Sequence, residues 1–515
     1  MAAEAKSNAD DEKKAKSADE LFKLYEQRKN EFESQIAEFP VPNNDILTAE
    51  HLKAKRQDIY RQMTQTYPMC HGGVLLLIYQ FLLAKREYGS SVEKKLYKKL
   101  TIADMMHRIF TKRAVVFYQQ YDSYMLRSGK RGGGDWQRVG SDGEAAQPCL
   151  KDYMSYDEIL LSALCGVSSP TFFINKGSRS NCGSMQFDDD DEAKLYPMPA
   201  VYMGLIGARF ETAEVMEYKL MIVQKHQNVA ENGYGEYRKH KDANLHRLEK
   251  AIDGQYFLEQ VKASREKFKD KHSLILSIFE SFYSRYYFPL YDEIDKLLPI
   301  DNDNGNDFMG GLFGGGGGMN DTGNAKKNNN AKKQPKEQSQ AEEKKENDEE
   351  SVKVLKQRYF RDDYGYGKVK PLMDVEMFRQ RIRVSLELFM FDSDERCKQS
   401  KQPGFCHLVG LGAGYWAFHK TRQDVEMVKV ALDIIRDSDL AHIECLYFSW
   451  FSREAEEDAG LDGKETNNKR EYVVEDKKKK KIFVQFGNRN PADPLDEKFK
   501  AKKCLICACY AWDGN

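Results

Sequence analysis

The spacing of apolar residues along the chain predicts three structured regions separated by polar stretches. Residues 1–16 are small and charged and show no periodicity, so we expect a disordered tail there. Apolar residues then recur at helical spacing, and the apolar stretch at 69–88 predicts a buried helix. A further helix should begin at Thr101 and run to about residue 126. Residues 17–127 therefore predict a helical region.

A region that contains strands follows at 128–300. Short apolar runs with alternating or β-branched character predict strands, and helical spacing returns afterwards. The strands are expected at 171–175, 201–207 and 217–223, and the helices at 243–261 and 271–298. The last helix carries an aromatic stripe made of Phe279, Phe282, Tyr283, Tyr286, Tyr287 and Phe288. Such a stripe is more typical of a buried helix face than of a binding surface.

The clearest break in the pattern lies at 301–350, where Gly, Asn, Lys and Glu dominate. Such a segment buries too little apolar area to order itself, so we predict a disordered linker or insertion. Beyond it, 351–515 alternates between helical and strand patterns. We expect helices at 372–396 and 420–436, strands at 405–409, 443–449, 482–486 and 504–510, and a charged loop at 453–476. Alternation of this kind predicts a parallel or mixed sheet.

The predicted fold class is therefore α+β. It consists of a helical N-terminal region, a middle region that contains strands, and a C-terminal three-layer α/β module. The chain ends directly after an apolar strand, where ligands bind in open α/β sheets. Sequence patterns leave open whether this module is complete or truncated.

Composition excludes some classes of function. The 80 basic and 81 acidic residues give a net charge of −1, whereas a chain built to bind nucleic acid usually carries a large basic excess. The lysine run at 477–481 and the acidic run at 454–458 predict a solvated hairpin rather than a docking surface. We expect no nucleic acid partner.

Cysteine usage and the N-terminus predict a cytoplasmic protein. Several of the 10 cysteines lie in apolar runs, where a reduced thiol behaves as a small hydrophobic group. The N-terminus is polar and has no signal-peptide core. The longest apolar stretch, at 72–84, is shorter than the roughly 20 residues that a membrane span needs. We therefore expect reduced thiols and no membrane span.

The first candidate site is a glycine turn that contains Gly410, Gly412 and Gly414. It has the pattern G-x-G-x-x-A between a strand and a helix, where backbone N–H groups can surround a phosphate. However, Tyr415 and Trp416 are bulky, and no acidic residue closes the following strand to hold a ribose. An ordinary NAD site is excluded. The turn either contacts a phosphate or forms a tight structural corner, and on its own it favours the corner.

The second candidate site lies in the middle region. Asn175 and Arg179 follow one predicted strand, and Arg209 and Glu211 follow the next, so we expect them to converge at one sheet edge together with Glu217. An arginine that binds phosphate and a glutamate that polarises a ribose hydroxyl suit transfer from a nicotinamide dinucleotide. Arg209, Glu211 and Glu217 are the catalytic candidates. The alternative, which the residues alone favour, is that Arg209 and a carboxylate form a structural pair.

No metal site is predicted. Cys504 and Cys507 form a C-x-x-C, but zinc requires four ligands and no second pair has suitable spacing. On a strand, Cys507 and Cys509 would face one side and Cys504 the other. No cofactor is predicted, and ADP-ribose or NAD is the possible ligand.

Four segments resemble a known family, and they lie at 172–179, 204–211, 231–235 and 409–416. The chain resembles an uncharacterised family of protists, especially ciliate-like organisms, and of some intracellular bacteria. The resemblance covers about 60–515 apart from the tract at 301–350, and it implies no established activity. The C-terminal part is similar to a macrodomain-type α/β module, which implies an ADP-ribose-like ligand.

Two functions follow from these observations. The first is recognition or processing of a nucleotide-type ligand, with ADP-ribose as the leading candidate, when the glycine turn and the middle cluster are taken together. The alternative is a non-catalytic interaction or scaffold protein of a large cytoskeletal or ciliary assembly, with protein partners. The aromatic helices, the long polar linker and the lack of a complete catalytic set motivate this alternative.

Overall fold

The structure is a computed structural model that describes residues 64–225, 252–294 and 357–511, with gaps inside each range. The predicted tail at 1–16, the linker at 301–350, Arg179 and the segment 231–235 lie outside the described residues. No described helix is long and apolar enough to cross a membrane. The nine cysteines that the structure describes are free thiols, which confirms for them the expected reduced state.

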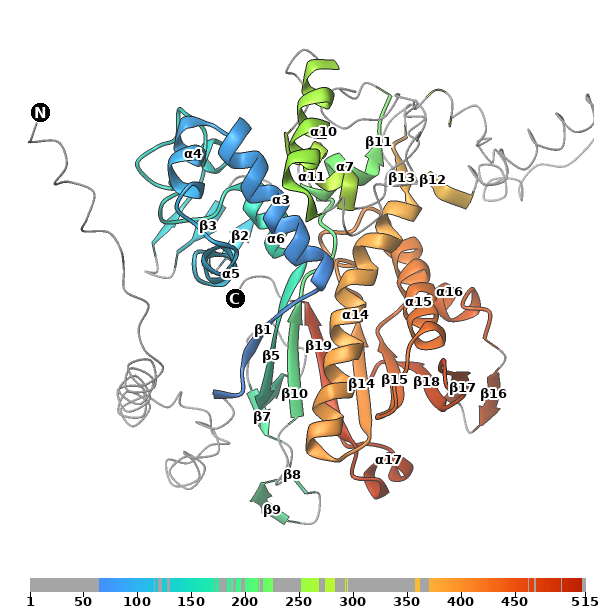
Figure 1. Cartoon of the computed structure of the whole chain (residues 1–515). Helices are drawn as coiled ribbons and strands as arrows, with labels where there is room; N and C mark the ends of the chain where they lie inside the picture. Colours follow the sequence, from blue (N-terminus) through green and yellow to red (C-terminus); the bar gives the residue numbers. More distant parts are fainter. Residues whose placement is uncertain are drawn as a thin grey trace, which may run out of the picture.

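A nine-stranded mixed sheet forms the centre of the molecule (Figure 1). Its strands, in spatial order, are β1 (Tyr67–Cys70), β5 (Cys165–Thr171), β10 (Ala200–Leu205), β19 (Leu505–Ala511), β14 (Gly404–Val409), β15 (Ile443–Ser449), β18 (Lys481–Gly487), β17 (Lys469–Glu475) and β16 (Gly463–Thr466). Neighbouring strands from β10 to β18 are parallel, whereas β5 and β17 are antiparallel to both of their neighbours. The predicted α+β class and mixed sheet are confirmed. The sheet takes strands from all three predicted regions, and the region boundaries themselves stay predictions.

The central strands are mostly apolar because both faces are covered. One face packs against α14 (Val375–Ser400) and α15 (Lys420–Asp437), and the other packs against α17 (Glu497–Ala501). Phe499 of α17 contacts Phe405 of β14, with ring centroids 5.1 Å apart. In β14, Cys406 and Leu408 face the long helices. This is the expected three-layer arrangement.

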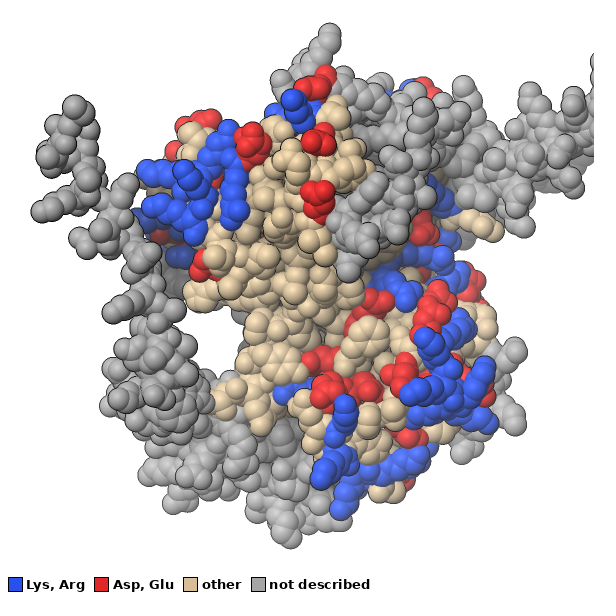
Figure 2. Space-filling view, viewed as in Figure 1, with Lys and Arg blue, Asp and Glu red and all other residues tan. Residues whose placement is uncertain are grey.

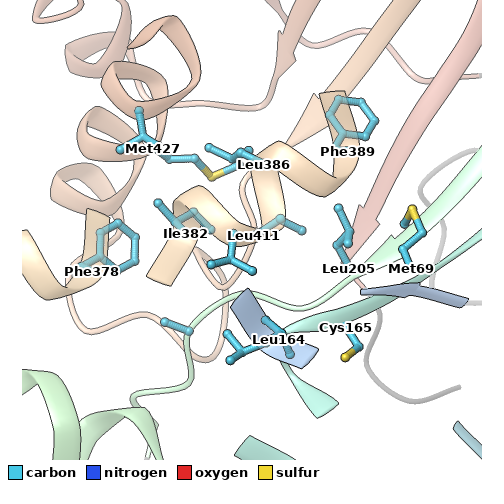
Figure 3. Close-up of a cluster of buried hydrophobic side chains, with 14 of the residues drawn as sticks. Met69, Leu164, Cys165, Leu205, Phe378, Ile382, Leu386, Phe389, Leu411 and Met427 are labelled. Carbon is cyan, nitrogen blue, oxygen red and sulfur yellow. The ribbon is translucent and has the colours of Figure 1, made fainter. Parts of the chain in front are cut away.

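The buried face of α14 organises the core. Phe378, Ile382, Leu386 and Phe389 are fully buried, and Figure 3 shows them beside side chains from α15, β10 and the glycine turn. Burial of each large apolar side chain contributes roughly 1.5–3 kcal/mol. The helix begins at Asp374, whose carboxylate accepts a hydrogen bond from the Met377 N–H, and it ends at Lys401 in the left-handed conformation. Packing against α14 thus fixes the loops that follow β10 and β14.

A group of helices lies beyond one end of the sheet (Figure 1): α3 (Gly72–Tyr88), α4 (Ser91–Tyr97), α5 (Ile102–Thr111), α6 (Tyr156–Ser162), α10 (Gly254–Lys267) and α11 (Leu274–Phe282). Three of them begin with a capping box, in which a Ser or Thr and an acidic residue three positions later bind each other's backbone N–H. Phe279 is buried and Phe282 is partly buried, which agrees with the core interpretation, while the rest of the aromatic stripe lies outside the described residues.

Smaller elements complete the fold. They are β2 (Val116–Tyr118), β3 (Ser123–Met125), β4 (Arg131–Gly132), β6 (Phe173–Asn175), β7 (Gly183–Met185), β8 (Phe187–Asp188), β9 (Asp191–Leu195), α7 (Glu217–Met221), β11 (Ile222–Val223), β12 (Tyr359–Arg361), β13 (Leu372–Asp374), α16 (Arg453–Glu457) and a 3₁₀ turn at Trp136–Arg138. On the surface, basic and acidic residues are mixed over the region of α15 to β18, whereas Lys and Arg gather over α4 (Figure 2).

Several predicted elements were wrong. The segment 217–223 is a helical turn followed by a two-residue strand, because it is buried on nearly every side and its alternation therefore carries no information about a sheet face. The helix from Thr101 ends at Thr111, and β-branched and aromatic residues then form β2 and β3. The supposed loop at 453–476 contains α16, β16 and β17. At 372–396, the first three residues belong to β13.

Candidate functional site

The parallel strands end together on one side of the sheet, and the loops after β10, β14, β15 and β18 open there. We call this side the carboxyl edge and the opposite side the amino edge. In open α/β sheets, ligands bind at the carboxyl edge. The glycine turn at 410–414 follows β14, and the segment from Arg209 to Glu217 follows β10. The structure therefore brings these two predicted sites to the same edge.

Two glycines join the loops. A Cβ atom on Gly207 would lie 2.2 Å from the Gly412 nitrogen, and one on Gly412 would lie 2.6 Å from the Ala208 oxygen. Gly412 also has a φ of +71°, which disfavours other residues. The backbones of the two loops therefore touch, although β19 separates their strands in the sheet. For Gly412, the structural-corner interpretation describes the contact that is present.

The other two glycines of the turn have more room. A Cβ atom on Gly410 would meet the Ala413 Cβ at 3.0 Å and an Asp424 carboxylate oxygen at 3.2 Å. A Cβ atom on Gly414 would meet nothing within 4 Å. These positions are consistent with an approach by a ligand, and their role stays a prediction.

Arg209 is buried between the two loops. Its guanidinium lies 4.2 Å from the centre of the Trp416 ring, and its Nη2 donates to Glu211 Oε1 at 2.7 Å. The Phe210 N–H donates to the Trp416 carbonyl at 2.9 Å. The pair between Arg209 and a carboxylate, which was the alternative interpretation, is therefore present. Trp416, which sequence reasoning treated as an obstacle, covers this arginine.

Glu217 is held by an arginine that sequence reasoning missed. Arg381 of α14 is fully buried, and its Nε donates to Glu217 Oε1 at 3.2 Å. Its Nη2 donates to the carbonyls of Ile206 and Gly207, at 3.0 and 3.3 Å. Burial raises the pKa of the Glu217 carboxyl above its ordinary value, and the charge of Arg381 opposes that shift. The only sequence signal was an arginine among the apolar positions of the predicted helix.

The start of α15 holds the glycine turn. Gln423 Oε1 accepts hydrogen bonds from the N–H groups of Phe418 and His419, and its Nε2 donates to the Gly412 carbonyl at 3.4 Å. Asp424 Oδ2 accepts from Lys420 Nζ at 2.5 Å and from the Ser452 N–H at 3.0 Å. Burial raises the pKa of Asp424, while Lys420 lowers it. This network connects the loops after β14 and β15.

Several buried polar atoms without a hydrogen-bond partner lie in β14 and in the segment after β10. Each such atom is costly, by about 1–3 kcal/mol, so a cluster of them requires an explanation. They include Glu211 Oε2, Glu217 Oε2 and His407 Nδ1, while the side chains of Asp424 and Ser452 interact with each other. Burial also lowers the pKa of His407 to about 4, so its imidazole is neutral near pH 7. The carboxyl edge is thus equipped to bind polar groups of a ligand.

The expected convergence of Asn175 with Arg209 is wrong. Asn175 lies in β6, which continues from β5, and β5 is antiparallel to β10 with Thr171 opposite Ala200. The chain therefore leaves β5 at the amino edge, away from Gly207. Sequence reasoning placed both segments after strands but could not determine the relative direction of those strands.

Within the described ranges, no three or more His, Cys, Asp or Glu side chains are grouped so that they could hold a metal ion. Cys507 and Cys509 are buried on the α14 side of the sheet, and Cys504 packs on the other side near Phe499. The predicted separation of these cysteines is confirmed.

Comparison with known families assigns this chain to a family. A family model described as ADP-ribosylhydrolase MavL-like matches residues 26–292 and 314–515. The chain belongs to the MavL-like ADP-ribosylhydrolase family. It is also similar to two proteins of Drosophila melanogaster, ADP-ribosylarginine hydrolase CG2909 and ADP-ribosylarginine hydrolase CG3568. The identities are 26% over 486 residues and 27% over 488 residues, which cover 93% and 94% of this chain and 75% of each relative.

Membership in the MavL-like family confirms the predicted class of ligand, because the family is named for ADP-ribose processing. It also corrects the expectation that the family lacks an assigned activity. The alternative of a non-catalytic cytoskeletal or ciliary scaffold receives no support from these similarities. Nothing in them bears on an origin in protists or intracellular bacteria.

Proposed function

We propose that this protein hydrolyses the bond between ADP-ribose and an arginine side chain of a protein, and that the reaction takes place at the carboxyl edge. The observation that carries the proposal is the cluster of buried, unpartnered polar atoms in β14 and in the segment after β10. A cluster of this kind is stable when a polar ligand completes its hydrogen bonds. The named activity of the two insect relatives supports arginine as the linked residue.

The diphosphate would lie on the turn that contains Gly410 and Gly414. The turn leads into α15, an 18-residue helix whose N-terminus carries partial positive charge. Gly412 has a different role in this proposal, since it packs against Gly207 and so fixes the turn. Asn175 is left out of the site because it lies at the amino edge, and Arg179 is left out because nothing places it there.

The two glutamates after β10 would act on the reacting ribose. A water oxygen forms a bond to the anomeric carbon, the bond from that carbon to the arginine nitrogen breaks, and the leaving guanidine takes up a proton. The products are ADP-ribose and the protein with its unmodified arginine side chain. Glu217 would accept the proton of the attacking water through its unpartnered Oε2, because its Oε1 is held by Arg381.

Glu211 would bind a ribose hydroxyl through its own unpartnered oxygen, Oε2. Arg209 and Trp416 would then position Glu211 rather than contact the substrate, because the guanidinium already lies between the ring and the carboxylate. In this proposal Arg209 is a positioning residue. The protein that carries the modified arginine is the expected partner.

The proposal is tested with purified full-length protein and substrates in which ADP-ribose is linked to arginine, serine or glutamate. Release of free ADP-ribose is measured by mass spectrometry. We expect release from the arginine-linked substrate, and faster release than from the other two. A folded protein that releases ADP-ribose from none of them would overturn the proposal. Faster release from the serine-linked or glutamate-linked substrate would support the hydrolase activity and refute arginine as the linked residue.

A further inference from the structure

We infer that Trp450, at the end of β15, forms the subsite for the nucleobase of the ligand; this inference rests on the function proposed above. The base would stack on the exposed face of the indole ring. Every base has a π face, and stacking of a base on an aromatic side chain is a common and strong contact in nucleotide recognition.

The register of the sheet places Trp450 beside the glycine turn. β14 and β15 are parallel neighbours, and Val409 pairs with Ser449 as the last residue pair. Gly410 and Trp450 are therefore the first residues beyond adjacent strands. Lys420 of α15 connects the two loops, because its Nζ donates to Asp424 Oδ2 at 2.5 Å and to the Trp450 carbonyl at 3.5 Å.

The indole ring is fixed on one side and exposed on the other. Trp450 is 40% exposed, and its ring forms a T-shaped pair with the His407 ring, with centroids 5.9 Å apart. His407 in turn stacks on Tyr447 at 5.9 Å, with ring planes 10° apart. The backbone N–H of Trp450 donates to the Gly487 carbonyl at 2.9 Å, which fixes the chain at this position. The contact with His407 restricts the indole ring before any ligand arrives.

The backbone of Trp450 is also unusual, because its φ is +62°. A bulky residue rarely adopts this left-handed conformation, and where it does, the surrounding structure must compensate for the strain. Glycine would satisfy the same backbone at no cost. A tryptophan at this position is therefore explained better by what its ring does than by the turn that it makes.

The polar surroundings of Trp450 point to a ligand independently of its backbone. His407, whose ring contacts the indole, is fully buried and its Nδ1 has no partner. Asp424 is also fully buried, and it binds Ser452, two residues after Trp450. The His407 nitrogen offers a hydrogen bond beside the indole ring, as a base or its attached ribose requires.

The order of strands arranges the subsites in line. Glu211 and Glu217 follow β10, Gly410 follows β14 and Trp450 follows β15, with β19 between β10 and β14. Three steps between adjacent strands span roughly 14 Å, at about 4.8 Å for each step. The reacting ribose, the diphosphate and the base of one extended ligand would follow each other along this edge in that order.

The test measures binding of ADP-ribose and of ribose 5-phosphate, which lacks the base, by calorimetry and by competition. The principal variant is Trp450→Gly, because glycine accepts the left-handed backbone. Phe391→Ala is the matched control, since Phe391 is 44% exposed on α14 and lies three residues before Asp394, which binds His442 at the amino edge. Trp450→Phe retains an aromatic face.

We expect Trp450→Gly to weaken ADP-ribose binding by roughly 5- to 150-fold, as the loss of one base stack predicts. Trp450→Gly should bind ribose 5-phosphate within about threefold of the wild-type affinity. Trp450→Phe and Phe391→Ala should bind ADP-ribose within about threefold of the wild-type affinity. Unchanged ADP-ribose affinity in folded Trp450→Gly would overturn the subsite and leave the hydrolase intact. Equal weakening of both ligands would also overturn it, because Trp450 would then only support the turn. A wild-type protein that neither binds nor releases ADP-ribose would overturn the proposed function itself.

Discussion

The two edges of the sheet differ in how their polar groups are satisfied. The amino edge has a pocket of about 370 Å³ next to the start of β14 and β15, lined by Lys398, Lys401, Gln402, Pro403, Ala441, His442, Glu444 and Lys480. Its main polar groups are bound. His442 Nδ1 lies 3.1 Å from Asp394, Lys480 Nζ donates to the Leu440 carbonyl at 2.9 Å, and Lys502 pairs with Glu444.

The carboxyl edge shows the opposite arrangement. Its loops are packed so tightly that a Cβ atom on Gly207 would overlap the facing backbone, yet several buried oxygen and nitrogen atoms remain without partners. The comparison teaches that a hollow is weaker evidence of function than unmet hydrogen bonds. In the amino-edge pocket the main polar groups already have partners within the protein. At the tightly packed carboxyl edge, several buried polar atoms would gain a partner only from a ligand.

The largest effect should come from Glu217→Gln, compared with Glu444→Gln at the amino edge. If Glu217 accepts the proton of water, its loss should lower kcat by about 10²- to 10⁴-fold, while Glu444→Gln stays within about twofold. Initial rates of ADP-ribose release measure both. Equal rates for Glu217→Gln and the wild-type protein would remove Glu217 from the mechanism.

The pH dependence of the rate sharpens the same point. Burial raises the pKa of Glu217 above its ordinary value, and a proton acceptor must be ionised to act. The rate should therefore begin to fall, as the pH is lowered, at a higher pH than an ordinary glutamate would give. If the residual activity of Glu217→Gln shows the same fall in rate at low pH, that fall belongs to the titration of another group.

Gly207→Ala should be the most destabilising single change among these glycines, and Gly414→Ala the least. The new methyl group at 207 would lie 2.2 Å from backbone atoms that cannot move without the core, whereas at 414 nothing lies within 4 Å. We expect a loss of about 3 kcal/mol or more in the free energy of unfolding for the first and less than about 0.5 kcal/mol for the second. Denaturant unfolding measures the difference. Similar values for both variants would show that the two loops do not touch.

His407 should make the carboxyl edge sensitive to acid. Its pKa falls from an ordinary value of 6.5 to about 4 on folding, because burial disfavours the charged ring. As the pH is lowered, the unfolded chain therefore binds a proton at this histidine before the folded chain does. The contribution of His407 to the free energy of unfolding is complete above pH 6.5 and is lost as the pH falls towards 4. The loss should reach about 3 kcal/mol. Unfolding at several pH values measures it, and His407→Gln should remove that part of the dependence.

The smallest effect should come from Lys480→Met at the amino edge. The variant loses hydrogen bonds from the ammonium group to the Leu440 and Ile443 carbonyls, so unfolding should become easier by about 1 kcal/mol. Affinity for ADP-ribose should not change, because this lysine lies at the other edge. A weaker affinity for ADP-ribose in the folded variant would show that the amino edge also contributes to ligand binding.

Much of the fold was predictable because the central strands are buried on both faces. Runs such as Ile443–Ser449 are then mostly apolar, and α15 has clear boundaries. Prediction failed where burial removed the periodic signal, as at 217–223, and where a polar sequence pairs only at a sheet edge, as in β16 and β17. In these places the neighbours in space, not the local pattern, decide the structure.

The candidate site was predicted in part for the same reason. The glycine turn, Arg209, Glu211 and Glu217 were found because each follows a strand in a recognisable local pattern. Arg381, Asp424, His407 and Trp450 were missed, since each becomes significant only through a contact with a distant segment. Asn175 was misplaced because the direction of β5 relative to β10 is a property of the sheet.

By itself, therefore, the sequence determined the central strands, the long helices α14 and α15 and the glycine turn, because hydrophobic burial and backbone preferences act over a few neighbouring residues. Only the tertiary structure decided that Gly207 packs on Gly412, that Arg381 holds Glu217, and that Glu211, Glu217 and His407 each bury an unpartnered atom. Those contacts join residues that are more than a hundred positions apart. Their free energy depends on three-dimensional packing and desolvation, which no local pattern records.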